Sequence, residues 1–253
     1  MISVDFKRML RSKLFYILIA CAFVIPILIT VMMTMMDGTV SIDHQTGQQV
    51  VMQGPENAWQ SIGALPTTDG ATMGGMDVMS MCNINMMFML VAVFICLFIS
   101  DDFRSGYAKN LFTVRANKVD YVVSKTLMGF VCGALLLVAY FVGAMLGGGI
   151  SSLSFDLGGL NAFNIVACML AKIFLMLVFV PIFVLVSVAA KQRAWLALCG
   201  SLAAGMLLFM MVSMITPLNS TIMHVGMCLA GGGMFSIGLG AASNLVLQKT
   251  SLV

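Results

Sequence analysis

Long apolar stretches alternate with shorter polar ones along the 253 residues of this chain. A helix that crosses a bilayer needs about 20 consecutive apolar residues. Six stretches reach that length, and they cover residues 14–36, 78–99, 122–147, 163–190, 195–216 and 222–247. The pattern therefore predicts an all-α membrane protein with six transmembrane helices, organised as a single transmembrane domain over residues 1–253.

Lysine and arginine residues occur only in alternate polar stretches or, for Lys125, at the adjoining edge of the third apolar segment, apart from Lys172 inside the fourth apolar segment. The other 12 are Lys7, Arg8, Arg11, Lys13, Arg104, Lys109, Arg115, Lys118, Lys125, Lys191, Arg193 and Lys249. The intervening stretches at residues 37–77, 148–161 and 217–221 contain none. Because cytoplasmic loops of membrane proteins are enriched in Lys and Arg, we expect both termini and the loop at residues 101–121 to be cytoplasmic.

The polar stretches carry local patterns of their own. Residues 1–13 are typical of a short amphipathic helix lying in the interface, with Lys7, Arg8 and Arg11 facing away from its apolar side. The alternative is a charged extension of the first transmembrane helix. In the extracytoplasmic loop, residues 40–43 and 48–52 predict a small hairpin, and residues 55–65 predict a short helix whose Trp59 and Ile62 touch the interface.

The cytoplasmic loop at residues 101–121 predicts a short helix over residues 105–113. Asn117 is then expected to cap the third transmembrane helix, with Asp120 three residues later as its capping-box partner. In the fourth segment, counting back from Ala190 places Lys172 near the outer boundary, where its amine could reach water. The alternative for Lys172 is a buried charge that lines a transport path.

Composition narrows the possible functions. Hydrophobic residues make up 60% of the chain and charged residues 9%, whereas a soluble domain has about 25% charged residues. The net charge of +3 does not indicate nucleic acid binding, because the basic residues follow the membrane topology. No phosphate-binding loop or HExxH motif occurs. The apolar segments hold almost no carboxylates, which argues against proton-coupled transport and favours an external energy source.

Methionine is unusually frequent, with 25 residues. Thioethers are suitable ligands for Cu(I), but they also form adaptable apolar surfaces, and the third explanation is a simple bias of lipid-facing helices. The second segment combines Met86 and Met89 with Asn83 and Asn85. We predict that these residues, together with Gly200 and Gly205 of the fifth segment, line a translocation path.

Small residues recur at helical spacing in two segments. The sixth segment has Gly232, Ser236, Gly240 and Asn244 four residues apart, and the third has two GxxxG pairs, at Gly129–Gly133 and Gly143–Gly147. Small residues at this spacing let helices approach closely. Packing within the chain and contact with a second copy both remain possible.

The run DDFRSGYAKNLFTVRANKVDYVVSKT at residues 101–126 resembles the first cytoplasmic loop of the permease subunits of type 2 ABC exporters. The matching residues are Asp102, Phe103, Arg104, Gly106, Lys109 and Asn110, and Arg115 belongs to the basic stretch that follows them. Tyr107 stands where threonine is commoner in that family. The amino-terminal run DFKRMLRSKLF also resembles the family's interfacial helix, and the finer likeness is to bacterial exporters of phenol-soluble modulins or lantibiotic-like peptides.

The resemblance implies a mechanism and partners. Two permeases, identical copies or homologues, would assemble with two separate ATPase subunits in the bacterial cytoplasmic membrane. The residues matched in the loop at 101–121 would contact the ATPase and transmit its movement to the membrane helices. ATP and Mg²⁺ would bind the ATPase, so this chain would be non-catalytic and hold no cofactor or metal. A permease for copper handling and a non-transporting immunity or sensor protein are the rival hypotheses.

Overall fold

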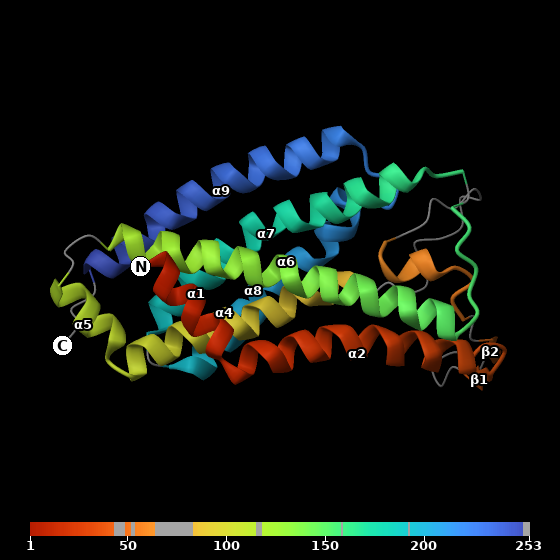
Figure 1. Cartoon of the computed structure of the whole chain (residues 1–253), viewed down its shortest axis with the longest axis horizontal. Coiled ribbons are helices and arrows are strands. Elements are labelled where there is room, and N and C mark those ends of the chain that lie inside the picture. Colours follow the sequence, from red (N-terminus) through yellow and green to blue (C-terminus); the bar gives the residue numbers. More distant parts are fainter. Residues whose placement is uncertain are drawn as a thin grey trace.

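The computed structural model describes residues 1–42, 49–51, 54–63, 83–114, 118–157, 159–191 and 193–249. Its long helices run alternately up and down in one elongated bundle (Figure 1). In chain order the helices and strands are α1 (Ile2–Arg11), α2 (Lys13–Met35), β1 (Val40–Ile42), β2 (Gln49–Val51), η1 (Ala58–Ser61), η2 (Ile84–Met86), α4 (Met87–Arg104), α5 (Tyr107–Val114), α6 (Val119–Ile150), α7 (Ala162–Ala190), α8 (Ala194–Ile215) and α9 (Ile222–Lys249).

Each of the six predicted apolar segments forms helix over most of the residues that the structure describes in it. In the part of the chain that the structure describes, five helices are long and apolar enough to cross a membrane, namely α2, the continuous stretch of η2 with α4, α6, α7 and α9. The fifth predicted segment forms α8, whose apolar part Ala194–Phe209 is shorter than these five. The predicted all-helical, multi-pass fold is therefore confirmed, with five long candidate spans among the described residues.

The amino-terminal prediction of a separate helix is confirmed. Ser12 has an extended backbone with φ −75° and ψ 124°, so α1 ends there and α2 begins at Lys13. The charged-extension alternative is wrong because this extended residue interrupts the helix. One detail of the prediction is also wrong, since Arg8 does not face away from the bundle. Its side chain is only 29% exposed and is paired with carboxylates of the bundle.

Helix α4 lies in the middle of the bundle and packs against α2, α6, α7 and α8. Its residues Met87, Phe88, Val91, Ala92, Ile95 and Ile99 are all fully buried. Helices α2 and α9, in contrast, expose large apolar side chains such as Leu28 and Ile237 along their outer faces. Such faces suit contact with lipid, because apolar side chains that face lipid tails are not exposed to water.

The small residues in α6 and α9 are used for packing within the chain. A Cβ added at Gly143 would lie 2.2 Å from the backbone oxygen of Phe23 in α2. At Gly232 it would lie 2.8 Å from the Cβ of Leu177 in α7. These glycines therefore let α6 approach α2 and let α9 approach α7 at distances that a side chain would prevent.

The hairpin predicted between the first two segments is confirmed. Strands β1 and β2 pair antiparallel, with Val40 opposite Val51, and the predicted turn lies outside the described residues. The short helix expected at residues 55–65 is a single 3₁₀ turn, η1, whose cap Asn57 accepts from the Trp59 amide at 3.0 Å. Ile62 is fully buried rather than at an interface, because it belongs to the main hydrophobic core.

Two predicted boundaries change in the structure. Helix α4 continues to Arg104, five residues beyond the predicted end of the second segment. The turn after it contains Gly106, whose φ of +76° suits glycine. Helix α5 begins at Tyr107, close to the predicted start of a short helix. At the start of α6 the N-cap is Lys118, without a capping side-chain hydrogen bond. The expected cap Asn117 lies outside the described residues.

Candidate functional site

Four charged side chains meet where α1, α4 and α6 come together. Lys125 Nζ lies 2.8 Å from Asp5 Oδ1 and 2.7 Å from Asp102 Oδ2. Arg8 Nη2 lies 2.7 Å from Asp102 Oδ1, and Arg8 Nη1 lies 3.7 Å from Asp5 Oδ1. Asp5, Asp102 and Lys125 are fully buried. We call these four residues the charge cluster, and its formal charges sum to zero.

Hydroxyl groups of α6 complete the coordination of the two carboxylates. Ser124 Oγ donates to Asp5 Oδ2 at 2.6 Å, and the Tyr121 hydroxyl donates to Asp102 Oδ2 at 3.2 Å. Buried charges persist only when they are paired and hydrogen-bonded. Each carboxylate here accepts from a cation and from a hydroxyl, so the interior tolerates it.

Aromatic rings cover the two cations of the charge cluster. The Arg8 guanidinium lies 5.0 Å from the centre of the Phe98 ring and 4.3 Å from that of Tyr107. Lys125 Nζ lies 4.5 Å from the centre of the Phe98 ring. These distances fall within the roughly 6 Å range of cation–π attraction. Because Tyr107 is the first residue of α5, the cluster also contacts that helix.

Burial and nearby charges shift the pKa values of Arg8 of the charge cluster and of the neighbouring Tyr107, which both lie outside the long spans. Burial alone would lower the pKa of the Arg8 guanidinium, but the Asp102 and Asp5 carboxylates raise it above its ordinary value. Burial raises the pKa of the Tyr107 phenol, and the Asp5 carboxylate raises it further, against the opposing effect of Arg8. Arg8 therefore stays charged and Tyr107 stays neutral near neutral pH.

Helix α5 presents one face to the bundle and one to the outside. Ala108 is fully buried, and the Phe112 ring packs edge-on against Tyr121 of α6 at 5.3 Å between ring centres. Lys109, Asn110 and Thr113 are exposed on the other side. Helix α5 is thus fixed to α6 by aromatic packing and to α4 by the tight turn at Gly106.

The residues predicted to contact an ATPase fall into two groups. Arg104, Lys109 and Asn110 are exposed. Asp102 is fully buried in the charge cluster, and Phe103 is 8% exposed and packs edge-on against Tyr121. Gly106 forms the turn between α4 and α5, and Arg115 lies outside the described residues. In this conformation the buried pair can only position the exposed residues.

Sequence reasoning did not find Asp5 and Lys125 as a pair, and it treated Arg8 and Lys125 only as topology signals. Helical spacing carried a partial signal. Asp5 lies four residues before the buried Met9, so the two share the face of α1 that packs inward. An ionised carboxylate on that face needs a compensating partner inside the protein. Which cation it pairs with could not be inferred, because Lys125 is 120 positions away.

A second buried polar group lies at the opposite end of α4. Lys172 of α7 is fully buried, and its Nζ donates to Asn85 Oδ1 at 2.8 Å and to Thr216 Oγ1 at 2.9 Å. The prediction that the amine reaches water at the outer boundary is therefore wrong. Burying the amine is tolerable because η2 and the end of α8 supply oxygen acceptors within the bundle.

The residues predicted to line a translocation path take part in packing within this chain, where α8 lies against α4 and α7. A Cβ added at Gly205 would lie 3.1 Å from Met89 Sδ, and one at Gly200 would lie 3.0 Å from Val186 Cγ1. Asn83 caps η2 by accepting from the Asn85 amide at 3.0 Å. Met86 and Met89 are half-buried. A path lined by these residues would require α8 to separate from α4 and α7, or these helices to face a second chain.

Among the described residues, no group of three or more His, Cys, Asp or Glu side chains is arranged to hold a metal ion. The sequence profile of the ABC-2 family transporter proteins matches residues 1–207, which is most of the chain. The chain belongs to the ABC-2 family of transporter proteins. Comparisons with curated proteins and with solved structures each found no match.

Membership of the ABC-2 family defines the general role of the chain. It is the membrane-spanning permease component of an ABC transporter and is non-catalytic itself. Residues 1–207 include α1, the charge cluster, α5 and most of α8. The family match therefore covers the whole of the candidate site, and α9 follows the matched region.

Proposed function

We propose that this ABC-2 protein is the permease subunit of an ATP-driven exporter in the bacterial cytoplasmic membrane. It moves an apolar or amphipathic substrate, a peptide, out of the cell. A separate ATPase binds ATP and Mg²⁺, and a second permease copy completes the pathway. The observation that carries the proposal is the charge cluster, because it joins α1, α4 and α6 beside the exposed helix α5.

The proposed topology has six spans and cytoplasmic termini. Helices α1 and α5 and the carboxyl end of α9 lie at one end of the bundle, and the hairpin β1–β2 lies at the other (Figure 1). Lys118 Nζ donates to the Leu247 oxygen at 2.7 Å, which ties the end of α9 to the start of α6. The exposed Lys7, Lys109 and Lys249 belong to these helices, which supports a cytoplasmic placement of this end.

The proposed mechanism is rigid-body transmission. The ATPase contacts the exposed face of α5 through Lys109 and Asn110, and also through Arg104 and Arg115, which precede and follow α5 in the sequence. Asp102 and Phe103 position that face, since they fix the end of α4 against α6. A displacement of α5 then moves α1, α4 and α6 together, because separating them would leave buried charges unpaired.

The proposed substrate path lies between two permease copies. Helix α8 exposes Met206, Leu207, Met211 and Met214, and thioether side chains adapt to varied apolar ligands. Met86, Met89, Asn83 and Asn85 of the neighbouring η2–α4 segment become part of this path when α4 shifts relative to Gly200 and Gly205 of α8. The methionines thereby shield apolar parts of the substrate.

The test is purification of the tagged permease in mild detergent from its native membranes. Wild-type protein should carry an ATPase whose activity is measured in the eluate. Lys109→Glu should lower the ATPase yield or uncouple hydrolysis from transport, because a reversed charge weakens a complementary interface. The control Lys7→Glu changes an exposed lysine of α1 and should leave the ATPase yield and the coupling of hydrolysis to transport unchanged.

Other outcomes would favour the rival hypotheses. Wild-type protein that carries no ATPase under any mild condition would contradict the permease role of this chain in an exporter and favour an immunity or sensor protein. Copper at one equivalent per chain would favour metal handling by the permease. A Lys109→Glu variant that binds the ATPase and transports as wild type does would show that α5 is only a connector.

A further inference from the structure

A pocket opens at the α1–α5 end of the bundle, where α2, α4 and α8 meet. Its volume is about 350 Å³, and ligand pockets commonly measure about 300–1,000 Å³. Its lining includes Ser12, Leu14, Leu97, Ser100, Asp101 and Arg104. Neither the proposed ATPase contact at α5 nor the proposed substrate path along α8 explains why a carboxylate, a guanidinium, two hydroxyls and an apolar wall line one pocket.

The pocket runs from polar to apolar along the bundle axis. Ser12 is the junction between the amphipathic helix α1 and the apolar helix α2, so it marks the level of the membrane surface. Leu14 and Leu97 lie farther along the two spans, whereas Asp101 and Arg104 belong to the last turn of α4. A ligand that fits this arrangement is polar at the surface and apolar toward the bilayer.

Ser100 supplies an unused hydrogen-bonding group inside the pocket. Ser100 is only 3% exposed, and its Oγ has no hydrogen-bond partner among the residues that the structure describes. Nearly all buried polar groups have such a partner. An acceptor oxygen of a bound ligand would give the Ser100 hydroxyl its missing hydrogen-bond partner.

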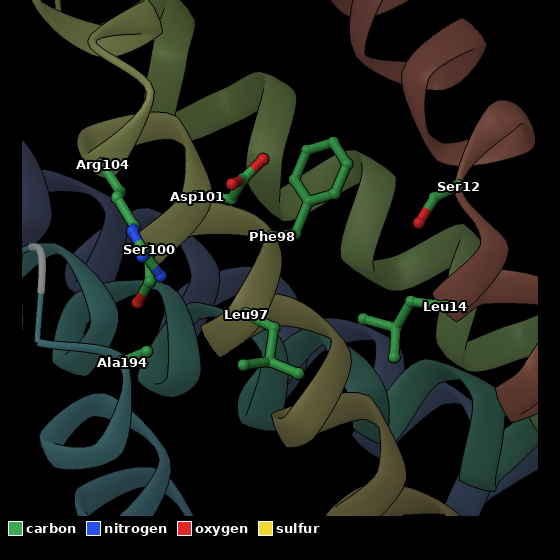
Figure 2. A pocket seen from close by; sticks show the side chains of 8 residues that line it. All are labelled: Ser12, Leu14, Leu97, Phe98, Ser100, Asp101, Arg104 and Ala194. Atoms are coloured by element: carbon green, nitrogen blue, oxygen red, sulfur yellow. The ribbon is translucent and has the colours of Figure 1, made fainter.

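Two opposite charges bracket the pocket. Figure 2 shows the Arg104 side chain extending toward Ser100 and Ala194, and the Asp101 carboxylate extending the opposite way, toward Phe98. Both residues are exposed, and neither forms an ion pair within the described part of the chain. A ligand that carries an anion and a cation a short distance apart would match them.

We propose that this pocket binds the headgroup of phosphatidylethanolamine from the surrounding bilayer. Arg104 and the Ser100 hydroxyl hold the phosphate diester, and Asp101 accepts from the primary ammonium. The acyl chains follow the wall at Leu14 and Leu97 into the membrane. A loop of a partner protein could meet the charged mouth but would leave this apolar wall without an occupant, so the observations favour a lipid.

The site lies beside the moving parts of the proposed transporter. The bound lipid would bridge α2, α4 and α8, and α4 leads directly into α5. A permease with an empty pocket would then lose contacts among these helices at the end where the ATPase acts. Lipid binding itself requires only that the folded chain sit in a membrane, so it does not depend on the ATPase.

The experiment is native mass spectrometry of delipidated permease titrated with three phospholipids. Phosphatidylethanolamine should bind about tenfold more tightly than phosphatidylcholine, whose quaternary ammonium donates no hydrogen bond, and more tightly than phosphatidylglycerol. Arg104→Gln should weaken binding of all three lipids. Asp101→Asn should abolish only the preference for ethanolamine. The control Lys7→Gln, an exposed charge on α1 outside the pocket, should bind as wild type.

Equal binding of the three lipids by wild-type protein would overturn the proposal, as would an Arg104→Gln variant that retains phosphatidylethanolamine fully. A preference for phosphatidylglycerol would overturn the assignment of Asp101 to an ammonium. If both variants keep the lipid but lose the ATPase during co-purification, the pocket is a partner contact and the lipid proposal is wrong. Because the titration uses the permease alone, its result is independent of the ATPase test.

Discussion

Lys125 of α6 and Asp5 of α1 are 120 positions apart in the chain, and Lys125 Nζ donates to Asp5 Oδ1 at 2.8 Å in a fully buried site. This pair fixes the amino-terminal helix to a membrane helix. It also places Lys125 between two carboxylates, since Asp102 of α4 lies on its other side. Three helices therefore depend on one cation.

We predict that Lys125→Met lowers the free energy of unfolding by about 3–5 kcal/mol, because it leaves buried carboxylates without their main partner. Chemical unfolding of the permease in detergent measures this change. Lys109→Met removes an exposed lysine of α5 and should change the stability by less than about 0.5 kcal/mol. Equal effects of the two substitutions would contradict a role for the charge cluster in holding α1.

A second substitution separates lost pairing from lost packing. Adding Asp5→Asn to Lys125→Met removes one of the stranded charges. The double variant should be more stable than Lys125→Met alone, because the largest cost of the single change is an uncompensated carboxylate. A double variant that is less stable than Lys125→Met would show that the cost comes from packing instead.

The contact of α6 with α2 depends on the absence of a side chain at Gly143. Gly143→Ala would place its Cβ 2.2 Å from the backbone oxygen of Phe23, so one helix must move. We expect a loss of about 1–3 kcal/mol in unfolding free energy. Gly149→Ala is the matched control, because no atom lies within 4 Å of its Cβ position. Comparable losses at both glycines would contradict the close approach.

Burial of Lys172 predicts that its amine resists modification. In folded, detergent-solubilised protein, a water-soluble amine-reactive ester should label the exposed Lys191 and Lys249 but not Lys172, which has no exposed surface. Peptide mass spectrometry measures the labelling, and unfolding should make Lys172 reactive. Labelling of Lys172 in the folded protein at the rate of Lys191 would instead support an amine at the water boundary.

The proposed topology predicts opposite accessibility at the two ends of the bundle. In a background without native cysteines, a cysteine introduced at Thr39 should react with an impermeant thiol reagent in intact cells. One introduced at Ser105 should react only after the cells are opened. Both positions are exposed in the structure, so burial does not explain a difference. Reaction of Ser105→Cys from outside would contradict cytoplasmic placement of α5.

Local elements were predictable because their signals lie within a few residues. Residues 40–43 and 48–52 predicted the hairpin, and residues 105–113 predicted a short helix between α4 and α6. The end of α4 was harder to predict. Charged residues at 101–104 resemble a loop, yet they continue the helix, because Asp102 is neutralised by Arg8 and Lys125. That neutralisation depends on contacts with other helices.

The sequence by itself determined the apolar segments, the alternation of basic residues between them and the family resemblance, since all three depend on residues close together in the chain. Only the tertiary structure decided that Arg8 turns inward, that Asp5 meets Lys125, and that Lys172 donates to Asn85 and Thr216. The physical reason is that helical periodicity defines the faces of each helix, whereas the partner of a buried charge depends on how separate helices pack together.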